Sequence, residues 1–298
     1  MTTPEGFRSG FVSFVGRPNT GKSTLTNALV GEKIAITSSR PQTTRHAIRA
    51  IVHREDAQII LVDTPGLHRP HTLLGERLNA LVEYTYSDVD LIGMCIPAGE
   101  RIGPGDTWIL QQVRKLCPST PILGLVTKID SVSKKRVMEQ LVAVSEFLGP
   151  EAEVVPVSAV SGEQVDVVAD VIASLLPEGP RFYPEDIITE ESDESRMAEL
   201  IREAALEGVR DELPHSIAVS IEEVLPHEGR DDMVDVHATV YVERQSQKSI
   251  VLGKGGSRMR EVGTRARAGI EDLLGTRVYL DLHVKVLKEW QRDPKMLG

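Results

Sequence analysis

Cysteines and aromatic residues are scarce in this chain of 298 residues. The chain has 2 cysteines, Cys95 and Cys117, and only 4% of its residues are aromatic. Cys95 lies in the apolar run 91–96 and Cys117 lies near the expected end of a helix, so we expect one core and one surface residue. The scarcity argues against a disulfide framework or a cysteine metal site, and it favours a reducing cytoplasm.

Two other absences bear on location. Residues 1–5 lack the basic and apolar regions of a signal peptide. No apolar run approaches the ~20 residues that are needed to span a bilayer. With 41% hydrophobic residues the chain can still form ordinary cores. We therefore expect a soluble, cytoplasmic protein. We also expect it to be a monomer.

The segment 16–23 carries the most specific signal in the chain. It fits the pattern G-x-x-x-x-G-K-[ST], whose backbone N–H groups wrap the phosphates of a nucleotide. The apolar run 11–15 predicts a strand before it and residues 24–30 predict a helix after it, the arrangement that aims a helix N-terminus at an anion. We expect a bound nucleoside polyphosphate, held by Gly16, Arg17, Pro18, Asn19, Thr20, Gly21, Lys22, Ser23 and Thr24.

A carboxylate after a second apolar strand predicts a magnesium site. Asp63 follows the run 59–62, so it lies at the carboxyl end of a strand, where α/β sheets bind ligands. Mg²⁺ keeps much of its water shell, so Asp63 would hold it through water, with Ser23 as a direct ligand. The glycine of this segment lets the backbone approach a γ-phosphate. The predicted residues are Asp63, Thr64, Pro65, Gly66 and Leu67.

Two later segments, 127–130 and 157–159, favour guanine over adenine. Asp130 can accept paired hydrogen bonds from the ring N–H and the amine of guanine. Adenine offers no such pair of donors, and an unmatched buried carboxylate is costly. Lys128 would lay its stem along the base, and the segment 157–159 can present a backbone N–H to the guanine carbonyl. Each segment follows an apolar run, 122–126 or 154–156, and the predicted residues are Thr127, Lys128, Asp130, Ser158 and Ala159.

The order of expected elements predicts two domains. Expected strands, such as 47–52, alternate up to about residue 176 with helices at 73–87, 106–116, 134–148 and 163–176. This alternation predicts an α/β P-loop domain with a mostly parallel sheet and helices on both faces. Three prolines and a glycine in 177–184 then break the pattern and predict a semi-rigid linker. We therefore assign a nucleotide-binding domain to 1–176, a linker to 177–185 and a second domain to 186–298.

The second domain has the pattern of a nucleic-acid binder. A helix over 196–209, strands at 216–225 and 234–242, a short helix, a helix over 257–274 and a strand at 278–286 give the order α-β-β-α-α-β. Between the last two helices lies a G-x-x-G loop, which lets a sugar–phosphate backbone approach. Basic residues crowd 244–267, although the chain carries a net charge of −10. A solvated helix face is the alternative to an RNA site at Lys248, Gly253, Lys254, Gly255, Gly256, Arg258 and Arg260.

The motif series, together with residues 42–46, resembles the Era family of translation-factor-type GTPases. The resemblance covers nearly the whole chain, because the C-terminal third is similar to a type II KH RNA-binding domain. It implies a GTPase that uses GTP, GDP and Mg²⁺, with Lys22, Thr44 and Gly66 as catalytic residues and Ser23, Thr44 and Asp63 as magnesium ligands. Thr43 is the alternative to Thr44.

The resemblance also implies partners. These are the small ribosomal subunit, whose assembly the protein would assist, and the 3′ region of 16S rRNA. Peripheral association with the inner membrane face is a further family property, but an acidic surface is repelled by anionic lipid.

Two positions depart from the family pattern. Thr127 replaces the usual asparagine and keeps one donor and one acceptor, so we expect less rigidity near the base but the same base. Leu67 lies where Ras-type enzymes place a water-orienting glutamine, so intrinsic hydrolysis should be slow. Two other functions stay open: an RNA-binding scaffold with a nearly inert nucleotide domain, and a P-loop ATPase or kinase that acts on a metabolite. The single phosphate loop argues against a tandem-G-domain GTPase.

Overall fold

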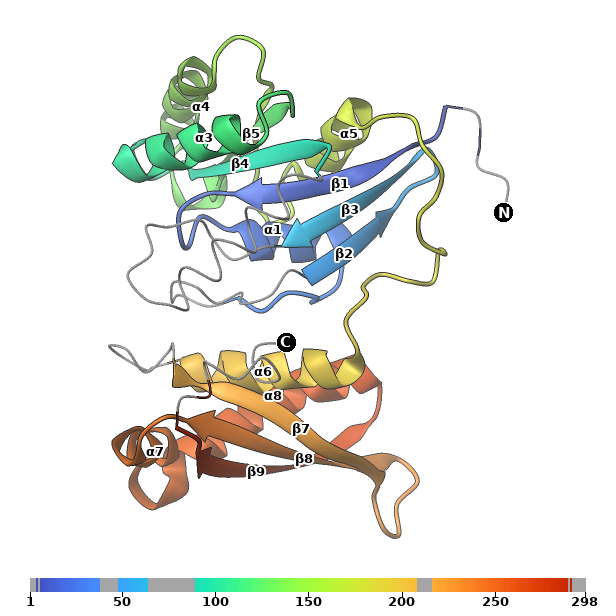
Figure 1. Ribbon diagram of the computed structural model, residues 1–298, viewed down its shortest axis with the longest axis vertical. Helices are drawn as coiled ribbons and strands as arrows, with labels where there is room; N and C mark the ends of the chain where they lie inside the picture. Colours follow the sequence, from blue (N-terminus) through green and yellow to red (C-terminus); the bar gives the residue numbers. More distant parts are fainter. Residues whose placement is uncertain are drawn as a thin grey trace. The chain divides into compact units, whose positions relative to one another are not determined.

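The computed structural model describes residues 4, 6–37, 48–63, 89–207, 216–288 and 290. The chain forms two compact units, Met1–Ala35 with Thr44–Glu190 and Ile36–Thr43 with Glu191–Gly298 (Figure 1). The limits that the sequence predicts for the two domains and the linker stay a prediction. The predicted helix 73–87 lies outside the described residues.

A six-stranded sheet forms the centre of the first unit, in the order β2-β3-β1-β4-β5-β6. Strand β2 is antiparallel to β3, and the other neighbours are parallel. The strands are β1 (Arg8–Val15), β2 (Ile48–His53), β3 (Ala57–Asp63), β4 (Leu91–Pro97), β5 (Ile122–Thr127) and β6 (Val154–Pro156). Every residue of β3 and β4 is buried, which explains the apolar runs 59–62 and 91–96 within them.

Helices cover both faces of this sheet, as predicted. They are α1 (Lys22–Val30), α3 (Pro104–Leu116), α4 (Lys134–Leu148) and α5 (Val165–Leu175). Leu25 of α1 and Ile172 of α5 share a core with Val12 and Phe14 of β1. Helices α3 and α4 contribute to a second core, together with Val15. Because alternate strand residues face opposite sides, the two cores lie on opposite faces of the sheet.

Residues 177–190, most of which we predicted to be a linker, run along the first unit. The Ile51 N–H donates to the carbonyl of Ile188 at 2.8 Å, and the Thr189 hydroxyl donates to the carbonyl of Arg49 at 2.8 Å. This segment, which we call the strap, therefore extends the hydrogen bonding of the edge strand β2 (Figure 1). The prolines end the alternating sequence pattern, but they do not prevent such bonding. Each proline lacks only its own backbone N–H, and its neighbours can still donate.

Gln58 of β3 holds the middle of the strap. Its side chain is fully buried. Its Oε1 accepts hydrogen bonds from the N–H groups of Phe182 and Tyr183, at 2.7 and 3.0 Å, and its Nε2 donates to the carbonyl of Tyr183 at 2.8 Å. One side chain therefore satisfies three backbone groups of the strap.

We expect Gln58→Leu to loosen the strap without unfolding the sheet. The substitution removes three hydrogen bonds to the strap, each worth about 1 kcal/mol, and leaves polar backbone groups unsatisfied. Trypsin should then cleave after Arg181 at least about tenfold faster, because local opening controls the cut. Gln111→Leu makes the same change on the exposed side of α3 and serves as the control. Equal cleavage of both variants and the parent protein would show that Gln58 does not hold the strap.

The second unit has a three-stranded sheet in the order β7-β8-β9. Strands β7 (Ala218–Pro226) and β8 (Met233–Val242) are antiparallel, and β9 (Arg277–Val286) is parallel to β8. The helices are α6 (Asp193–Leu206), α7 (Gln245–Leu252) and α8 (Ser257–Leu274), and the short turn η3 (Lys254–Gly256) joins the last two. The order α-β-β-α-α-β is the predicted one.

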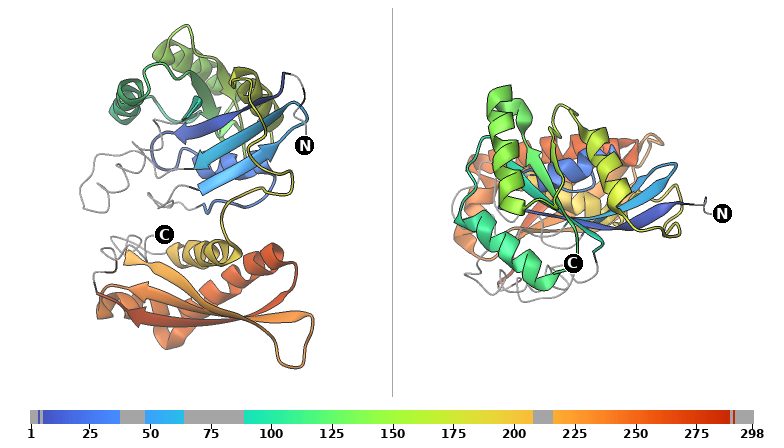
Figure 2. Two further views of the ribbon diagram at one scale, coloured as in Figure 1. Left: turned by 45° about the vertical axis from the view of Figure 1, so that its right-hand side comes forward. Right: turned by 90° about the horizontal axis from the view of Figure 1, so that it is seen from above.

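Helices α6 and α8 pack side by side against one face of this sheet (Figure 2). Met197, Ile201 and Ile270 of the helices share one core with Val236 and Val240 of β8. Trp290 is also buried, and its Nε1 donates to the carbonyl of Ser216 at 3.2 Å. The alternation of β8 therefore has the predicted cause, one buried and one open face.

The cysteine prediction is right for Cys95 and wrong for Cys117. Cys95 is fully buried in β4, and burial raises the pKa of its thiol to about 12. Cys117 follows α3 as predicted, but its side chain is only 7% exposed, so it is not a surface residue. Neither cysteine takes part in a disulfide bond. Within the described part of the chain, no helix is long and apolar enough to cross a membrane.

Candidate nucleotide site and nucleic-acid interface

The predicted phosphate loop joins β1 to α1 at the carboxyl end of the strand. Gly16, Asn19 and Gly21 have positive φ angles of 155°, 62° and 96°. A Cβ on Gly16 would lie 2.6 Å from the carbonyl oxygen of Cys95, so only glycine fits there. Within the described chain no side chain caps the N-terminus of α1, the end of a helix that attracts an anion.

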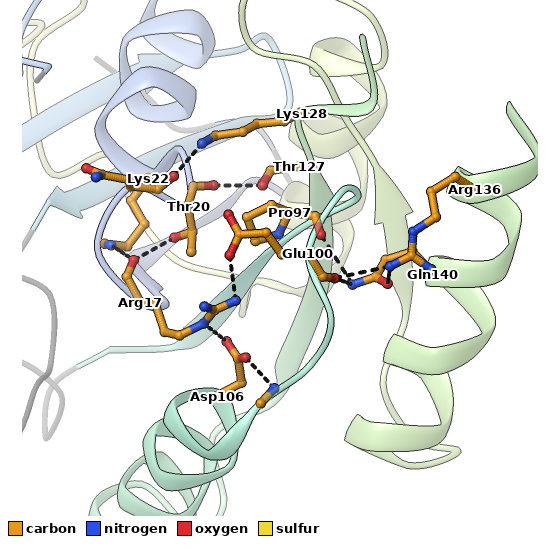
Figure 3. Close-up of polar contacts among 12 residues, drawn as sticks. Arg17, Thr20, Lys22, Pro97, Glu100, Asp106, Thr127, Lys128, Arg136 and Gln140 are labelled. Carbon is orange, nitrogen blue, oxygen red and sulfur yellow. Dashed lines mark hydrogen bonds and ion pairs between the residues drawn. The ribbon is translucent and has the colours of Figure 1, made fainter. Parts of the chain in front are cut away.

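Lys22 begins α1 and lies buried beneath the loop. Its Nζ donates to the carbonyl of Arg17 at 2.9 Å (Figure 3). It also donates to the carbonyl of Gly16 at 3.2 Å. Burial lowers the pKa of this lysine, because the protein replaces water around a positive charge. The loop therefore holds a poorly solvated cation, which a polyphosphate would stabilise.

Ser23 and Asp63 bring two oxygen ligands together. The Ser23 hydroxyl donates to Asp63 Oδ2 at 2.8 Å, and Asp63 ends β3 with 1% of its surface exposed. A hydroxyl and a carboxylate fit Mg²⁺, which binds oxygen and takes its remaining ligands from phosphate and water. The described residues contain no group of three or more His, Cys, Asp or Glu side chains that could hold a metal ion.

The predicted base-reading residues adjoin the phosphate loop. The Thr127 hydroxyl donates to the carbonyl of Thr20 at 2.7 Å, and Lys128 Nζ donates to the carbonyl of Asn19 at 2.5 Å (Figure 3). We expected the threonine to weaken this region, yet its hydroxyl keeps a direct bond to the loop. Thr127 is buried, and this bond to Thr20 satisfies its hydroxyl there.

Ser158 orients the carboxylate that is predicted to read guanine. Its hydroxyl donates to Asp130 Oδ1 at 2.5 Å and accepts from the N–H of Ser161 at 3.2 Å. Asp130 lies in the short turn η1 (Ile129–Ser131) after β5, and Ser158 follows β6. Ala159 comes next in the chain. The phosphate loop and both base-reading segments therefore lie together at the carboxyl edge of neighbouring parallel strands.

Several predicted site residues lie outside the described part of the chain. These are Thr43, Thr44, Thr64, Pro65, Gly66 and Leu67.

Three glycines shape the predicted RNA loop. Gly253, Gly255 and Gly256 have φ angles of 72°, 60° and 74°, a conformation that most residues avoid. A Cβ on Gly253 would lie 2.7 Å from Cβ of Arg258, whereas nothing lies within 4 Å of one on Gly255. Lys254 is exposed at the tip, and Lys248 is partly buried on α7. The loop therefore presents bare backbone and one cation at the N-terminus of α8.

The two arginines after the loop differ in their contacts. Arg258 donates to the carbonyls of Ala205 and Glu207, at 3.3 and 2.6 Å, at the C-terminal end of α6. Arg260 is exposed and donates to the carbonyl of Gly255 at 3.0 Å. Arg258 thus has a structural role that the sequence did not indicate. Arg260 stays on the surface beside the loop.

Sequence reasoning also missed the partners of Arg17. The Arg17 guanidinium forms ion pairs with Asp106 and Glu100, at 2.9 and 2.8 Å. Burial opposes the charge of Arg17, but these two carboxylates outweigh that effect and raise its pKa. No motif contains Asp106, so its spacing offered no signal.

These features define a GTPase domain followed by a KH domain. Residues 11–128 match the family described as 50S ribosome-binding GTPase, and residues 212–291 match the KH domain family. The chain belongs to the GTPase Era family. It is 72% identical over 292 residues to GTPase Era of Mycolicibacterium smegmatis, with 98% of both chains covered. GTPase Era of Mycobacterium tuberculosis is 68% identical over 293 residues, again with 98% of both chains covered.

Two solved structures resemble the whole chain. One is a crystal structure of Era in complex with MgGDPNP and nucleotides 1506–1542 of 16S ribosomal RNA, with a TM-score of 0.90, 36% identity and 98% of this chain and 97% of that chain covered. The other is a variant of Aquifex aeolicus Era bound to GDP·AlF4⁻, with a TM-score of 0.90, 36% identity and 98% of both chains covered. The predicted family and fold class are confirmed. A kinase or ATPase of metabolites has no support among these relatives.

Proposed function

We propose that this protein hydrolyses GTP with the help of Mg²⁺ and, when GTP is bound, binds the 3′ region of 16S rRNA during assembly of the small ribosomal subunit. The observation that carries the proposal is the likeness to the Era complex, which holds a magnesium-bound GTP analogue and that RNA. It supports the proposal because it extends over both units at a TM-score of 0.90. The residues of both sites in this chain fit the same ligands.

The chemistry is assigned to the residues of the nucleotide site. Lys22 neutralises the β- and γ-phosphates, and the N–H groups of the loop 16–21 bind their oxygens. Ser23 and Asp63 would hold Mg²⁺, whose charge offsets the charge that develops on the phosphates. Thr44 would complete that site in the GTP state, and Gly66 would contact the γ-phosphate. Because Leu67 cannot orient a water molecule, we propose slow intrinsic hydrolysis that RNA stimulates.

The choice of guanine is assigned to Asp130. Its second carboxylate oxygen and the Ser158-bound one can accept the ring N–H and the amine of guanine. Lys128 covers the base, and the backbone near Ala159 donates to the guanine carbonyl. Thr127 contacts no base in this assignment; it ties the base-reading segment to the phosphate loop through Thr20.

RNA binding is assigned to the G-x-x-G loop and its basic neighbours. Bare backbone at Gly255 and Gly256 lets the sugar–phosphate chain come close, and Lys254, Lys248 and Arg260 supply positive charge. The family description matched by residues 11–128 mentions the 50S subunit, whereas the solved complex contains 16S rRNA. The proposal follows the solved complex, because that complex resembles both units. Location in the cytoplasm stays a prediction from the composition, and peripheral membrane association stays a prediction from the family resemblance.

Asp130→Asn should test the nucleotide and RNA sites together. An amide in place of the carboxylate mismatches guanine but matches xanthine, so GTP affinity should fall at least about a hundredfold and xanthine triphosphate should bind instead. An RNA oligonucleotide of the 16S 3′ region should then bind more tightly with a xanthosine triphosphate analogue than with the GTP analogue. Fluorescence anisotropy of the labelled RNA measures the RNA affinity in the presence of each analogue.

Asp166→Asn makes the same change in the first turn of α5 and is the control. Unchanged guanine preference in Asp130→Asn would contradict the role of Asp130. RNA affinity that ignores the bound nucleotide in every variant would favour the scaffold alternative. Multiple-turnover GTP hydrolysis that rises with RNA would exclude an inert nucleotide domain.

A further inference from the structure

The side chain of Arg17 leaves the phosphate loop on the side of α3. Its Nε donates to Asp106 Oδ1 at 2.9 Å, and its second guanidinium nitrogen lies 2.8 Å from Glu100 Oε2 (Figure 3). The other oxygen of Asp106, Oδ2, accepts from the N–H of Gly103 at 2.9 Å, where α3 begins. One carboxylate therefore caps a helix and holds an arginine of the phosphate loop.

Burial separates the two partners of Arg17. The Asp106 side chain is 0% exposed, whereas that of Glu100 is 48% exposed. An ion pair at the surface contributes little, but a buried carboxylate that loses its partner is strongly unfavourable. Asp106 is thus the partner that holds Arg17, and Glu100 adds a weaker contact from the surface.

Packing leaves Arg17 little freedom. A Cβ on Gly105, in the first turn of α3, would lie 2.9 Å from Cδ of Arg17. The aliphatic stem of the arginine therefore lies directly against the helix backbone. A larger residue at position 105 would displace it.

The backbone of Arg17 carries this placement to the nucleotide site. Its carbonyl accepts from Lys22 Nζ at 2.9 Å and from the Thr20 hydroxyl at 3.0 Å (Figure 3). Thr20 in turn accepts from Thr127 through its own carbonyl. The position of the Arg17 peptide therefore sets where the Lys22 ammonium and the Thr20 peptide lie.

The segment that holds the acids is itself anchored. Gln140 of α4 is almost fully buried, and its Nε2 donates to the carbonyls of Pro97 and Glu100, at 3.2 and 2.9 Å. Arg136 donates to Gln140 Oε1 at 3.1 Å. Helix α4 thus holds the backbone of Glu100, a few residues before the start of α3, where Asp106 lies (Figure 3).

We infer that Arg17 and Asp106 are positioning residues that hold the phosphate loop in the shape that binds nucleotide, acting through the Arg17 carbonyl and with neither side chain touching a phosphate. The inference rests on the proposed nucleotide site. It assigns Arg17, which the motif counts as a variable position, to the support of Lys22. It also adds Asp106, from outside every motif, to the determinants of nucleotide affinity.

Arg17→Gln, Asp106→Asn and the double variant test the inference. We expect each single variant to raise the dissociation rate of a fluorescent GDP analogue, and the KM for GTP, about tenfold with kcat within about threefold. Because the two residues act as one unit, the double variant should be no worse than the poorer single variant. Arg17→Lys should restore the rate to within about threefold of the parent, since an ammonium can still donate to the Asp106 carboxylate. Stopped-flow fluorescence gives the rates.

Asp170→Asn is the control, because it breaks the Arg54–Asp170 ion pair elsewhere in the same unit. The unfolding temperature of each nucleotide-free variant shows whether it folds. If Asp106→Asn does not fold, the test rests on Arg17→Gln alone, because the Arg17 side chain is 30% exposed and its replacement disturbs the core less. Unchanged dissociation rates in folded variants, or single effects that add in the double variant, would overturn the inference. Failure of the parent protein to bind guanine nucleotides would instead overturn the proposed function.

Discussion

Lys22→Ala should lower the affinity for GTP and GDP at least about a hundredfold. The substitution removes the ammonium that is proposed to form charge-assisted hydrogen bonds with the β- and γ-phosphates. The Nζ atom already lies within the loop, 2.9 and 3.2 Å from two carbonyls, so no rearrangement is needed for it to meet a phosphate. Isothermal titration calorimetry measures the affinity. Lys115→Ala removes an exposed lysine from α3 and should leave it unchanged.

The lowered pKa of Lys22 distinguishes lost binding from lost folding. A buried lysine whose pKa falls on folding is harder to protonate than in the unfolded chain, so its charge opposes folding at neutral pH. The nucleotide-free Lys22→Ala variant should therefore unfold at a temperature no lower than the parent protein. GDP should raise the unfolding temperature of the parent protein only, because a ligand stabilises the state that binds it. If the nucleotide affinity of Lys22→Ala stays within about threefold of that of the parent protein, the role assigned to Lys22 is wrong.

Gly255→Asp should reduce RNA affinity about a hundredfold and leave GTP affinity unchanged. The new carboxylate would stand where the RNA phosphates approach, and its charge repels them. The fold should tolerate it, because nothing lies within 4 Å of the added Cβ and aspartate accepts a φ of 60° better than most residues do. Fluorescence anisotropy with the 16S 3′ oligonucleotide, in the presence of a GTP analogue, gives the affinity.

Gly229→Asp is a closely matched control. Gly229 lies in the turn between β7 and β8 of the same unit, has a φ of 80° and also has nothing within 4 Å of an added Cβ. Both variants add the same charge to the same unit, so only the position differs. If Gly229→Asp weakens RNA binding as much, the cause is net charge and not the G-x-x-G loop. Binding of the parent protein that does not weaken with salt would contradict phosphate contacts altogether.

Long elements with a regular apolar pattern could be predicted closely. Helix α4 spans Lys134–Leu148 and helix α8 spans Ser257–Leu274, the bounds that the sequence predicted. Their periodic apolar faces pack on one sheet each, so the local pattern and the tertiary structure agree. Helix α6 begins at Asp193, three residues before the predicted start, because the Ser192 hydroxyl accepts from the N–H of Ser195 and caps it.

The nucleotide site could be predicted because its residues follow strands of one parallel sheet. The residues after β1, β5 and β6 come together with Asp63, at the end of β3, for a topological reason, since parallel strands end at the same edge. The strap could not be predicted, because Gln58 is bound to Phe182 and Tyr183 by backbone groups that no side-chain pattern marks. A run of prolines and glycine ends an alternating pattern equally well in a free linker and in a bound segment.

The sequence by itself determined which ligand chemistry the chain carries, because the glycines, the lysine and the aspartate of each motif are required locally by backbone conformation and by hydrogen bonding to phosphate or base. Only the tertiary structure decided which groups support those motifs. Arg17 and Asp106 are 89 positions apart, and Thr20 and Thr127 are 107 positions apart. Such pairs depend on the packing of helices and strands in three dimensions, and neither periodicity nor spacing along the chain records it.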